Sequence, residues 1–367
     1  MRRSTTTFLS SYLRSTCLLI IPIILLLTAC QLPPASTPVR PPLDPTAVKP
    51  LPNWVQVYFS DPTNPNSESL RGGPDKILAD AIRATRLSVD IAAYELDLWS
   101  IRDALIDAHR RGVSVRMVTD SDNVDEREVK DLKDGGIQVL GDRREGLMHD
   151  KFVILDGQDV WTGSMNYTLN SAYRNNDNLI HLHSPELAKD YTTEFNEMFI
   201  NDQFGPGSPA NTPFSTLTIG DTLIEVYFSP DDRVEKQIVR LIGSATRSIR
   251  FMAYSFTSDR IAQAMLERAA AEVSVAGVFE ESQVQTNYGS EYDRLQSAGL
   301  PVQKDGNPRN MHHKVIIIDD SIVITGSYNF TANAETQNDE NILVIHSPDI
   351  AADYLKEFEK IYDQAQE

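Results

Sequence analysis

Two stretches of 21 residues hold the side chains that could do chemistry. Residues 148–168, MHDKFVILDGQDVWTGSMNYT, and 311–331, MHHKVIIIDDSIVITGSYNFT, agree at 11 positions. Each has a histidine and a lysine two residues apart, an aspartate five residues later, and then Gly-Ser-x-Asn. A single such pair would indicate only a polar strand end. Its return at a matched position indicates a functional site in a duplicated domain.

The residue types in these stretches suit attack on a phosphodiester. Side chains two apart in an extended strand face the same way, so His149 lies on the same face as Lys151, and His312 on the same face as Lys314. A neutral imidazole can attack phosphorus, and a protonated one can protonate the leaving alkoxide. The lysines would supply the positive charge that brings a nucleophile to an anionic phosphate.

Other paired phrases extend the repeat over the chain from about residue 54. VQVYFS at 55–60 returns as IEVYFS at 224–229, and LIHLHSPELAKDY at 179–191 returns as LVIHSPDIAADY at 343–354. Alternating strand and helix patterns fill each half. We therefore expect an α/β fold made of two duplicated domains, each a mixed β-sheet flanked by helices.

The motif His-x-Lys-x-x-x-x-Asp resembles that of the phospholipase D superfamily, as does the following Gly-Ser-x-Asn. This resemblance spans roughly residues 54–365, and it is strongest to small bacterial phospholipase D-like proteins and to the related endonuclease and cardiolipin synthase branches. It implies two domains packed with a pseudo-two-fold relation around one shared site. One histidine would form a phosphohistidine and the other would act as acid and then base, with no metal or other cofactor. One copy of the chain would suffice for a complete site.

The resemblance also assigns roles to further residues of both halves. An acidic residue 28 positions beyond each histidine would accept a hydrogen bond from a histidine ring; these are Asp177, a departure from the usual glutamate, and Glu340. The amides of Asn166 and Asn329 would bind the phosphate. We expect Ser164 and Ser327 to support the phosphate or the histidine.

Several polar residues near the motifs are expected to have other roles. Asp156 and Asp319 fall at predicted hairpin turns, so both are predicted to be structural. His313 should face away from His312, and His183 and His346 should lie where a strand leads into a helix. Charged residues just before the motifs could steer an anionic substrate, or they could be solvated loop charges; they are Arg143, Arg144, Lys304 and Arg309.

The first 53 residues read as an export signal and a tether. Arg2, Arg3 and Arg14 precede an apolar stretch ending in LTAC, which resembles a bacterial lipoprotein signal with Cys30 as the lipidated residue. The expected segments are a lipoprotein signal peptide 1–30, a proline-rich tether 31–53, domain one 54–200, a linker 201–222 and domain two 223–367. The protein is expected to be extracytoplasmic and anchored to a membrane of the bacterial envelope.

The sequence is compatible with three functions. A phospholipase D-type enzyme that hydrolyses or transfers phosphatidyl groups is favoured, because the net charge of −18 opposes loose binding to nucleic acid. An extracytoplasmic endonuclease is the first alternative, with nucleic acid as its substrate, and a non-enzymatic envelope binding module is the second. The head group, the choice between hydrolysis and transfer, the attacking histidine and the oligomeric state stay open.

Overall fold

The structure is a computed structural model, and it describes residues 51–366. The predicted signal peptide, Cys30 and the tether up to residue 50 lie outside the described residues. Within 51–366, no helix is long and apolar enough to cross a membrane.

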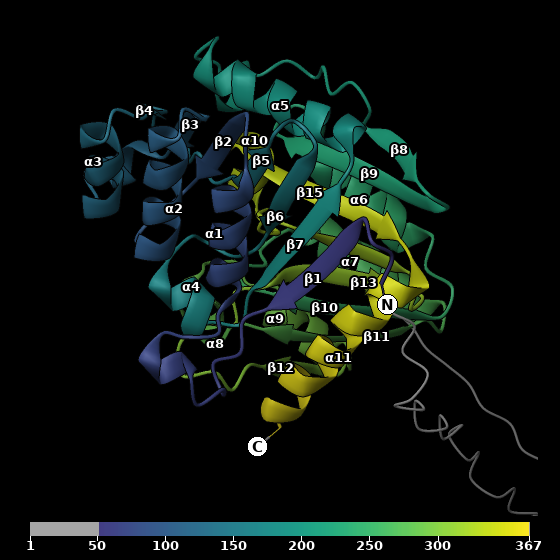
Figure 1. Ribbon diagram of the computed structural model, residues 1–367. Coiled ribbons are helices and arrows are strands. Elements are labelled where there is room, and N and C mark those ends of the chain that lie inside the picture. Colours follow the sequence, from purple (N-terminus) through teal and green to yellow (C-terminus); the bar gives the residue numbers. More distant parts are fainter. Residues whose placement is uncertain (1–50, 367) are drawn as a thin grey trace, which may run out of the picture. The chain divides into compact units, whose positions relative to one another are not determined.

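The first half forms a seven-stranded mixed sheet (Figure 1). In spatial order its strands are β1 (Val55–Phe59), β7 (Asn178–His183), β6 (Asp159–Gly163), β5 (Lys151–Leu155), β2 (Ser88–Ala93), β3 (Ser114–Thr119) and β4 (Gln138–Gly141). Strands β2, β3 and β4 pair in parallel, while the other pairs are antiparallel.

The second half repeats this order and adds one strand at an edge. Its strands are β12 (Val302–Lys304), β11 (Ser274–Phe279), β10 (Ser248–Ala253), β13 (Lys314–Ile318), β14 (Ile322–Gly326), β15 (Glu340–His346), β9 (Thr222–Ser229) and β8 (Thr216–Ile219). The matching order confirms the predicted duplicated α/β fold. Strand β8 lies inside the segment predicted as linker 201–222, where a Gly-Asp turn joins it to β9 as a tight hairpin.

Helices follow the same repeat. The first half has α1 (Pro74–Ala84), α2 (Trp99–Arg110), α3 (Arg127–Asp134), α4 (Leu169–Tyr173) and α5 (Pro185–Phe199). The second has α6 (Val234–Gly243), α7 (Asp259–Ala270), α8 (Glu281–Thr286), α9 (Tyr292–Ser297), α10 (Ala332–Thr336) and α11 (Pro348–Gln364). Both α5 and α11 begin at a Ser-Pro pair, in which the serine caps the helix and proline occupies its first turn.

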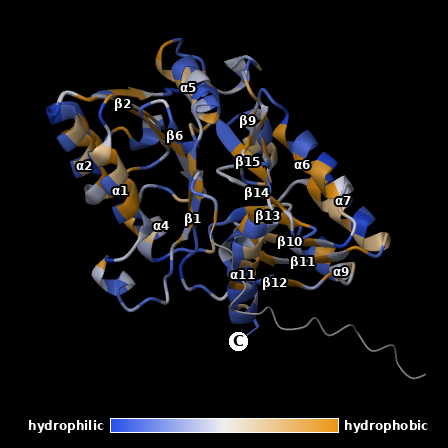
Figure 2. Ribbon diagram, turned by 45° about the vertical axis from the view of Figure 1, so that its right-hand side comes forward, coloured by the Kyte–Doolittle hydropathy of each residue, from blue (hydrophilic) through white to orange (hydrophobic). Residues whose placement is uncertain are grey.

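The two sheets share one core, and each has a second core on its outer face. Helices α1 and α2 cover the outer face of the first sheet, and α6 and α7 cover that of the second (Figure 2). Between the sheets, α5 and α11 contribute to a core in which Phe152 of β5 and Val315 of β13 belong to the same cluster. The motif strands are thus buried on both faces, which explains their unbroken apolar runs.

The motif aspartates Asp156 and Asp319 close the hairpins after β5 and β13. Both have left-handed backbone angles, with φ of 53° and 52°. The carboxylate of Asp156 accepts hydrogen bonds from the backbone N–H groups of Leu87 at 2.7 Å and Ser88 at 3.0 Å. Asp319 does the same with Arg247 and Ser248, at 2.7 and 2.9 Å. Each aspartate therefore ties its hairpin to the start of the adjacent strand, at the far end from the histidine.

Replacing Asp156 by alanine should destabilise the fold while leaving the specific activity of folded protein nearly unchanged. Backbone donors would lose a charged acceptor, so we expect unfolding to be easier by about 1.5–3 kcal/mol. Chemical unfolding checks the first expectation, and activity per folded molecule the second. Gln158→Ala, in the same hairpin but with an exposed side chain, is the control. A large fall in activity at unchanged stability would contradict the structural role.

Candidate active site

Each motif segment pairs with the acid-bearing segment of the opposite half. His149 N donates to Asp339 O at 3.0 Å, and Asp339 N donates to Leu147 O at 2.9 Å. The second motif repeats the contact, with His312 N to Asn176 O and Asn176 N to Asn310 O, both 2.9 Å. These short parallel bridges bring the two motifs into one site.

The histidine–carboxylate pairs cross between the halves as well. His149 Nδ1 lies 2.7 Å from Glu340 Oε2, and His312 Nδ1 lies 2.9 Å from Asp177 Oδ1. Both carboxylates are fully buried, and both histidines are 6% exposed. A carboxylate at Nδ1 makes that nitrogen the protonated one, so each ring presents Nε2 to the reaction. The predicted acidic residues therefore each hold the histidine of the other domain.

The motif lysines are buried beneath the histidines. Lys151 Nζ donates to His149 O at 2.6 Å, and Lys314 Nζ donates to His312 O at 2.8 Å. Lys151 is 1% exposed and Lys314 is 2% exposed. The backbone carbonyl of each motif histidine thus holds the lysine of the same motif close to that histidine. The site brings two lysine side chains together, and its motif residues include no arginine.

Two tyrosines that the motifs did not indicate contact the histidine rings. The ring centroid of Tyr94 lies 4.9 Å from that of His149, and that of Tyr254 lies 4.5 Å from that of His312. Lys314 Nζ also lies 4.7 Å from the centroid of the Tyr254 ring. A signal existed, because AAYEL at 92–96 and MAYSF at 252–256 align in the repeat.

The structure places the motif serines on the carboxylates rather than on an open phosphate position. Ser164 Oγ donates to Asp177 Oδ1 at 2.7 Å and accepts from Asn178 N at 3.0 Å. Ser327 Oγ accepts from Asn341 N at 2.9 Å. Both serines are fully buried. The contact of Ser164 with Asp177 agrees with the expected support of a histidine, because Asp177 bonds His312. Direct support of a phosphate by these hydroxyls stays a prediction.

The motif asparagines Asn166 and Asn329 are half-buried. Asn166 Nδ2 reaches Glu95 Oε2 at 3.5 Å. The side-chain oxygens of both asparagines have no hydrogen-bond partner among the described residues. Their amides stand after β6 and β14, at the same end of the sheets as the histidines, where they can serve a bound phosphate.

In the absence of substrate, burial lowers the pKa of the motif lysines and histidines. It lowers the pKa of Lys151 to about 8, and that of Lys314 to about 7 with a further contribution from Lys151. Burial and the two lysines hold the pKa of His149 well below its usual value. Burial also lowers the pKa of His312 to about 4, although Asp177 opposes this. An anionic phosphate between these groups would restore their protons.

The two carboxylates differ in charge. Burial raises the pKa of Glu340 to about 7, despite the opposing charge of Lys151. Burial also disfavours the ionised form of Asp177, but His312 and Lys314 outweigh it and lower its pKa below the usual value. Asp177 is thus the fully charged member of the two, and it stabilises a protonated His312 better than Glu340 stabilises a protonated His149.

The remaining predicted polar residues lie outside the reacting groups. His313 is fully buried and bonds Asn178 Nδ2 through Nδ1 at 3.1 Å. His183 pairs with Asp159 at 3.0 Å, and His346 with Glu225 at 2.8 Å.

The charged residues before the motifs differ in their contacts: some form ion pairs within residues 51–366, and others do not. Arg144 pairs with the buried carboxylate of Asp339, and Arg143 pairs with Asp202. Lys304 lies over the ring of Tyr292. Arg309 is exposed in a hollow lined by residues of both halves. Arg144 is therefore committed to the fold rather than to substrate steering.

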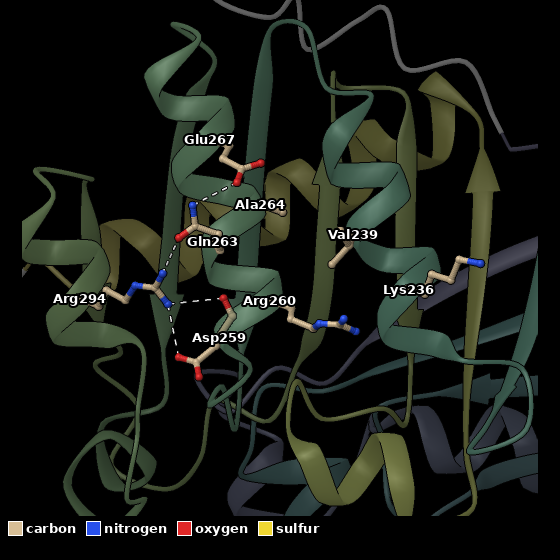
Figure 3. A pocket seen from close by; sticks show the side chains of 8 residues that line it. All are labelled: Lys236, Val239, Asp259, Arg260, Gln263, Ala264, Glu267 and Arg294. Atoms are coloured by element: carbon tan, nitrogen blue, oxygen red, sulfur yellow. Dashed lines mark hydrogen bonds and ion pairs between the residues drawn. The ribbon is translucent and has the colours of Figure 1, made fainter.

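The described residues hold no candidate metal cluster, and a large hollow on the second half lies apart from the motif residues. Within residues 51–366, no group of three or more His, Cys, Asp or Glu side chains could hold a metal ion. A hollow of about 660 Å³ lies among α6, α7 and α9, where Arg294 bonds Asp259 and Gln263 (Figure 3). It contains none of the motif residues.

Comparison with known proteins supports the same reading of the repeat. Residues 78–199 and 238–362 each match the family model described as cardiolipin synthase, PLD-like domain. The chain belongs to this family, and so to the phospholipase D superfamily of phosphodiesterases. The two matches coincide with the two halves.

Individual relatives cover one half or both. The chain is 32% identical over 167 residues to a phospholipase D of Rickettsia bellii, which is 46% of this chain and 82% of that protein. It is 35% identical over 122 residues to the mitochondrial cardiolipin hydrolase of Chlamydomonas reinhardtii, which is 33% of this chain and 54% of that relative's length. The phosphatidylserine synthase structure of Haemophilus influenzae matches 84% of this chain and 86% of that chain, with a TM-score of 0.61 and 13% identity. That last likeness shows the fold alone.

The specificity constant kcat/KM should fall as the pH rises through about 7 to 8. In the free protein Lys314 and Lys151 lose their protons in this range, and with them the charge that attracts the phosphate. A roughly tenfold or greater loss is expected within two pH units above these pKa values. NMR of protein labelled at the lysine ε-carbon would follow the two titrations directly. Constant kcat/KM across this range would contradict the assignment.

Proposed function

We propose that the protein is a metal-independent phospholipase D-type phosphodiesterase that hydrolyses or transfers phosphatidyl groups. The observation that carries this proposal is the pair of crossed histidine–carboxylate contacts above two buried lysines. Two imidazoles, each held by a carboxylate at Nδ1, are what a two-step displacement at phosphorus requires.

In the first step, His149 Nε2 attacks phosphorus and forms a P–N bond. The P–O bond to the leaving alcohol breaks, and protonated His312 donates its Nε2 proton to the departing oxygen. We assign attack to His149 because burial and the two lysines hold its pKa well below the usual value, which favours the neutral ring. His312 takes the acid role because ionised Asp177 stabilises its protonated form.

In the second step, the neutral His312 removes a proton from water. The water oxygen bonds to phosphorus, the P–N bond breaks, and His149 is regenerated with phosphatidic acid as the product. An alcohol in place of water would give transfer instead of hydrolysis. Lys151 and Lys314, with the amides of Asn166 and Asn329, would neutralise the negative oxygens in both steps.

A lipid fits the surroundings of the site better than a polynucleotide does. The net charge is −18, and carboxylates stand close to the motif residues: Glu95 beside Asn166, Asp120 on the backbone N–H of Met148, and Glu280 on that of Met311. A polynucleotide would bring further phosphates toward these carboxylates, whereas a phosphatidyl lipid carries one phosphodiester.

The full-length protein in detergent should release the head group from phospholipid in mixed micelles, and should do so in excess EDTA. His149→Ala and His312→Ala should each reduce kcat by at least about 10³-fold per folded molecule. Folding is measured in parallel, because loss of either imidazole leaves a buried carboxylate unpaired and lowers the thermal midpoint. His183→Ala, a partly exposed histidine of the first half, is the control. Acid-soluble nucleotides from DNA or RNA without any lipid product would establish the nuclease alternative. Loss of activity in EDTA would contradict the metal-free scheme.

We also propose that a lipid on Cys30 keeps the protein at an envelope membrane. The support is the LTAC sequence after an apolar stretch, and the anchor would hold the site near its lipid substrate. Incorporation of labelled palmitate in the wild type, but not in Cys30→Ala, tests this. Equal labelling of both would remove Cys30 as the anchor.

A further inference from the structure

A hollow of about 370 Å³ adjoins the site on the second half. Two residues of the site line it: Tyr254, whose ring contacts His312, and Asn329 of the Gly-Ser-x-Asn element. Asn338 also lines it and donates to Glu340 Oε1 at 3.2 Å. A group attached to the reacting phosphate could therefore extend into this hollow.

The polar groups that line the hollow are uncharged. They are hydroxyls and amides, including Ser255, Thr257, Gln283, Asn287, Tyr288 and Asn333. Of the residues that the structure describes, no aspartate, glutamate, lysine or arginine lines it. Four lining side chains form a chain of neutral hydrogen bonds: Asn287 Nδ2 to Ser255 Oγ at 2.8 Å, Asn287 Nδ2 to Gln283 Oε1 at 3.0 Å, and Gln283 Nε2 to Tyr254 OH at 3.3 Å.

The repeat makes this neutrality specific to the second half. Ser255 and Thr257 follow Tyr254 where Glu95 and Asp97 follow Tyr94. The backbone alignment agrees, because Asp97 N donates to Tyr167 O and Thr257 N donates to Phe330 O in matching bridges. The same fold therefore places carboxylates after Tyr94 on one flank of the phosphate position, and hydroxyls after Tyr254 on the other.

A short helix supplies part of the hollow. Gln283 lies on α8, and Asn287 and Tyr288 follow that helix. Between the matching strand β3 and helix α3, the first half has a short 3-10 turn, Ser121–Asn123, in place of α8. The second half has thus gained a helix whose side chains shape the hollow beside Tyr254.

We propose that this hollow, which we call the neutral subsite, binds an uncharged polyhydroxyl head group and makes the enzyme prefer it to amine head groups. The proposal rests on the lipid function proposed above. Hydroxyls and amides both donate and accept, so they can satisfy the hydroxyls of a glycerol or a ring polyol. A buried ammonium would lose water there without gaining a carboxylate.

The test compares head groups on lipids with the same acyl chains in mixed micelles, using the full-length protein. Phosphatidylglycerol and phosphatidylinositol should have kcat/KM values at least about tenfold above those of phosphatidylethanolamine and phosphatidylcholine. Gln283→Ala and Asn287→Ala should each lower kcat/KM for phosphatidylglycerol by about 3- to 10-fold, mainly through KM. The values for phosphatidylcholine should stay within about twofold.

Ser255→Glu should shift the head-group preference in the opposite direction, because it places in the neutral subsite the carboxylate found at the matching position of the first half. The ratio of kcat/KM for phosphatidylethanolamine to kcat/KM for phosphatidylglycerol should rise. Gln263→Ala, on α7 in the separate hollow of Figure 3, is the matched control and should alter neither substrate.

The outcomes separate this proposal from the lipid function itself. Hydrolysis of all four lipids at similar rates, or a preference that Gln283→Ala and Asn287→Ala leave intact, would overturn the neutral subsite alone. No hydrolysis of any lipid would overturn both. If the variants do not fold, competition on the wild type decides: glycerol phosphate should inhibit at least about threefold better than phosphocholine, and equal inhibition would reject the proposal.

Discussion

The motif histidine of each half is held by a carboxylate of the opposite half. His149 of the first half is bonded to Glu340 of the second, and His312 of the second to Asp177 of the first. All four side chains are at least nine-tenths buried, so each carboxylate and each imidazole needs the other to compensate for lost water. The packing of the halves is therefore a condition for the chemistry as well as for stability.

Buried amides reinforce the same crossing. Asn341 Nδ2 donates to Asp150 Oδ1 at 2.6 Å, and Asn178 Oδ1 accepts from Tyr354 OH at 3.1 Å. Each asparagine follows its acidic residue in the chain and reaches into the opposite half. A shift of one half against the other would break the histidine pairs and these amide contacts together. The contacts therefore reinforce one another and fix the position of the two halves around the motif residues.

The repeated phrases allowed most of the fold and the site to be predicted. His149 and Lys151 could be assigned to one site because their spacing recurs with the second motif, and alternating patterns placed the strands and helices. The carboxylate partners could be named by position but not paired, since the partners lie 191 and 135 residues apart and their contact depends on domain packing. The role of Ser164 could not be predicted either, because the same motif serine could contact a phosphate or a buried carboxylate.

The crossed pairing is tested most directly by NMR of protein labelled with ¹⁵N-histidine. Glu340→Gln removes the charge from the partner of His149 and leaves the second pair intact. Crossed pairing predicts that the ¹⁵N resonances of the His149 ring shift and that those of His312 do not, with the reverse result for Asp177→Asn. If Glu340→Gln instead shifted only His312, each carboxylate would hold the histidine of its own half, and the shared site described above would be contradicted.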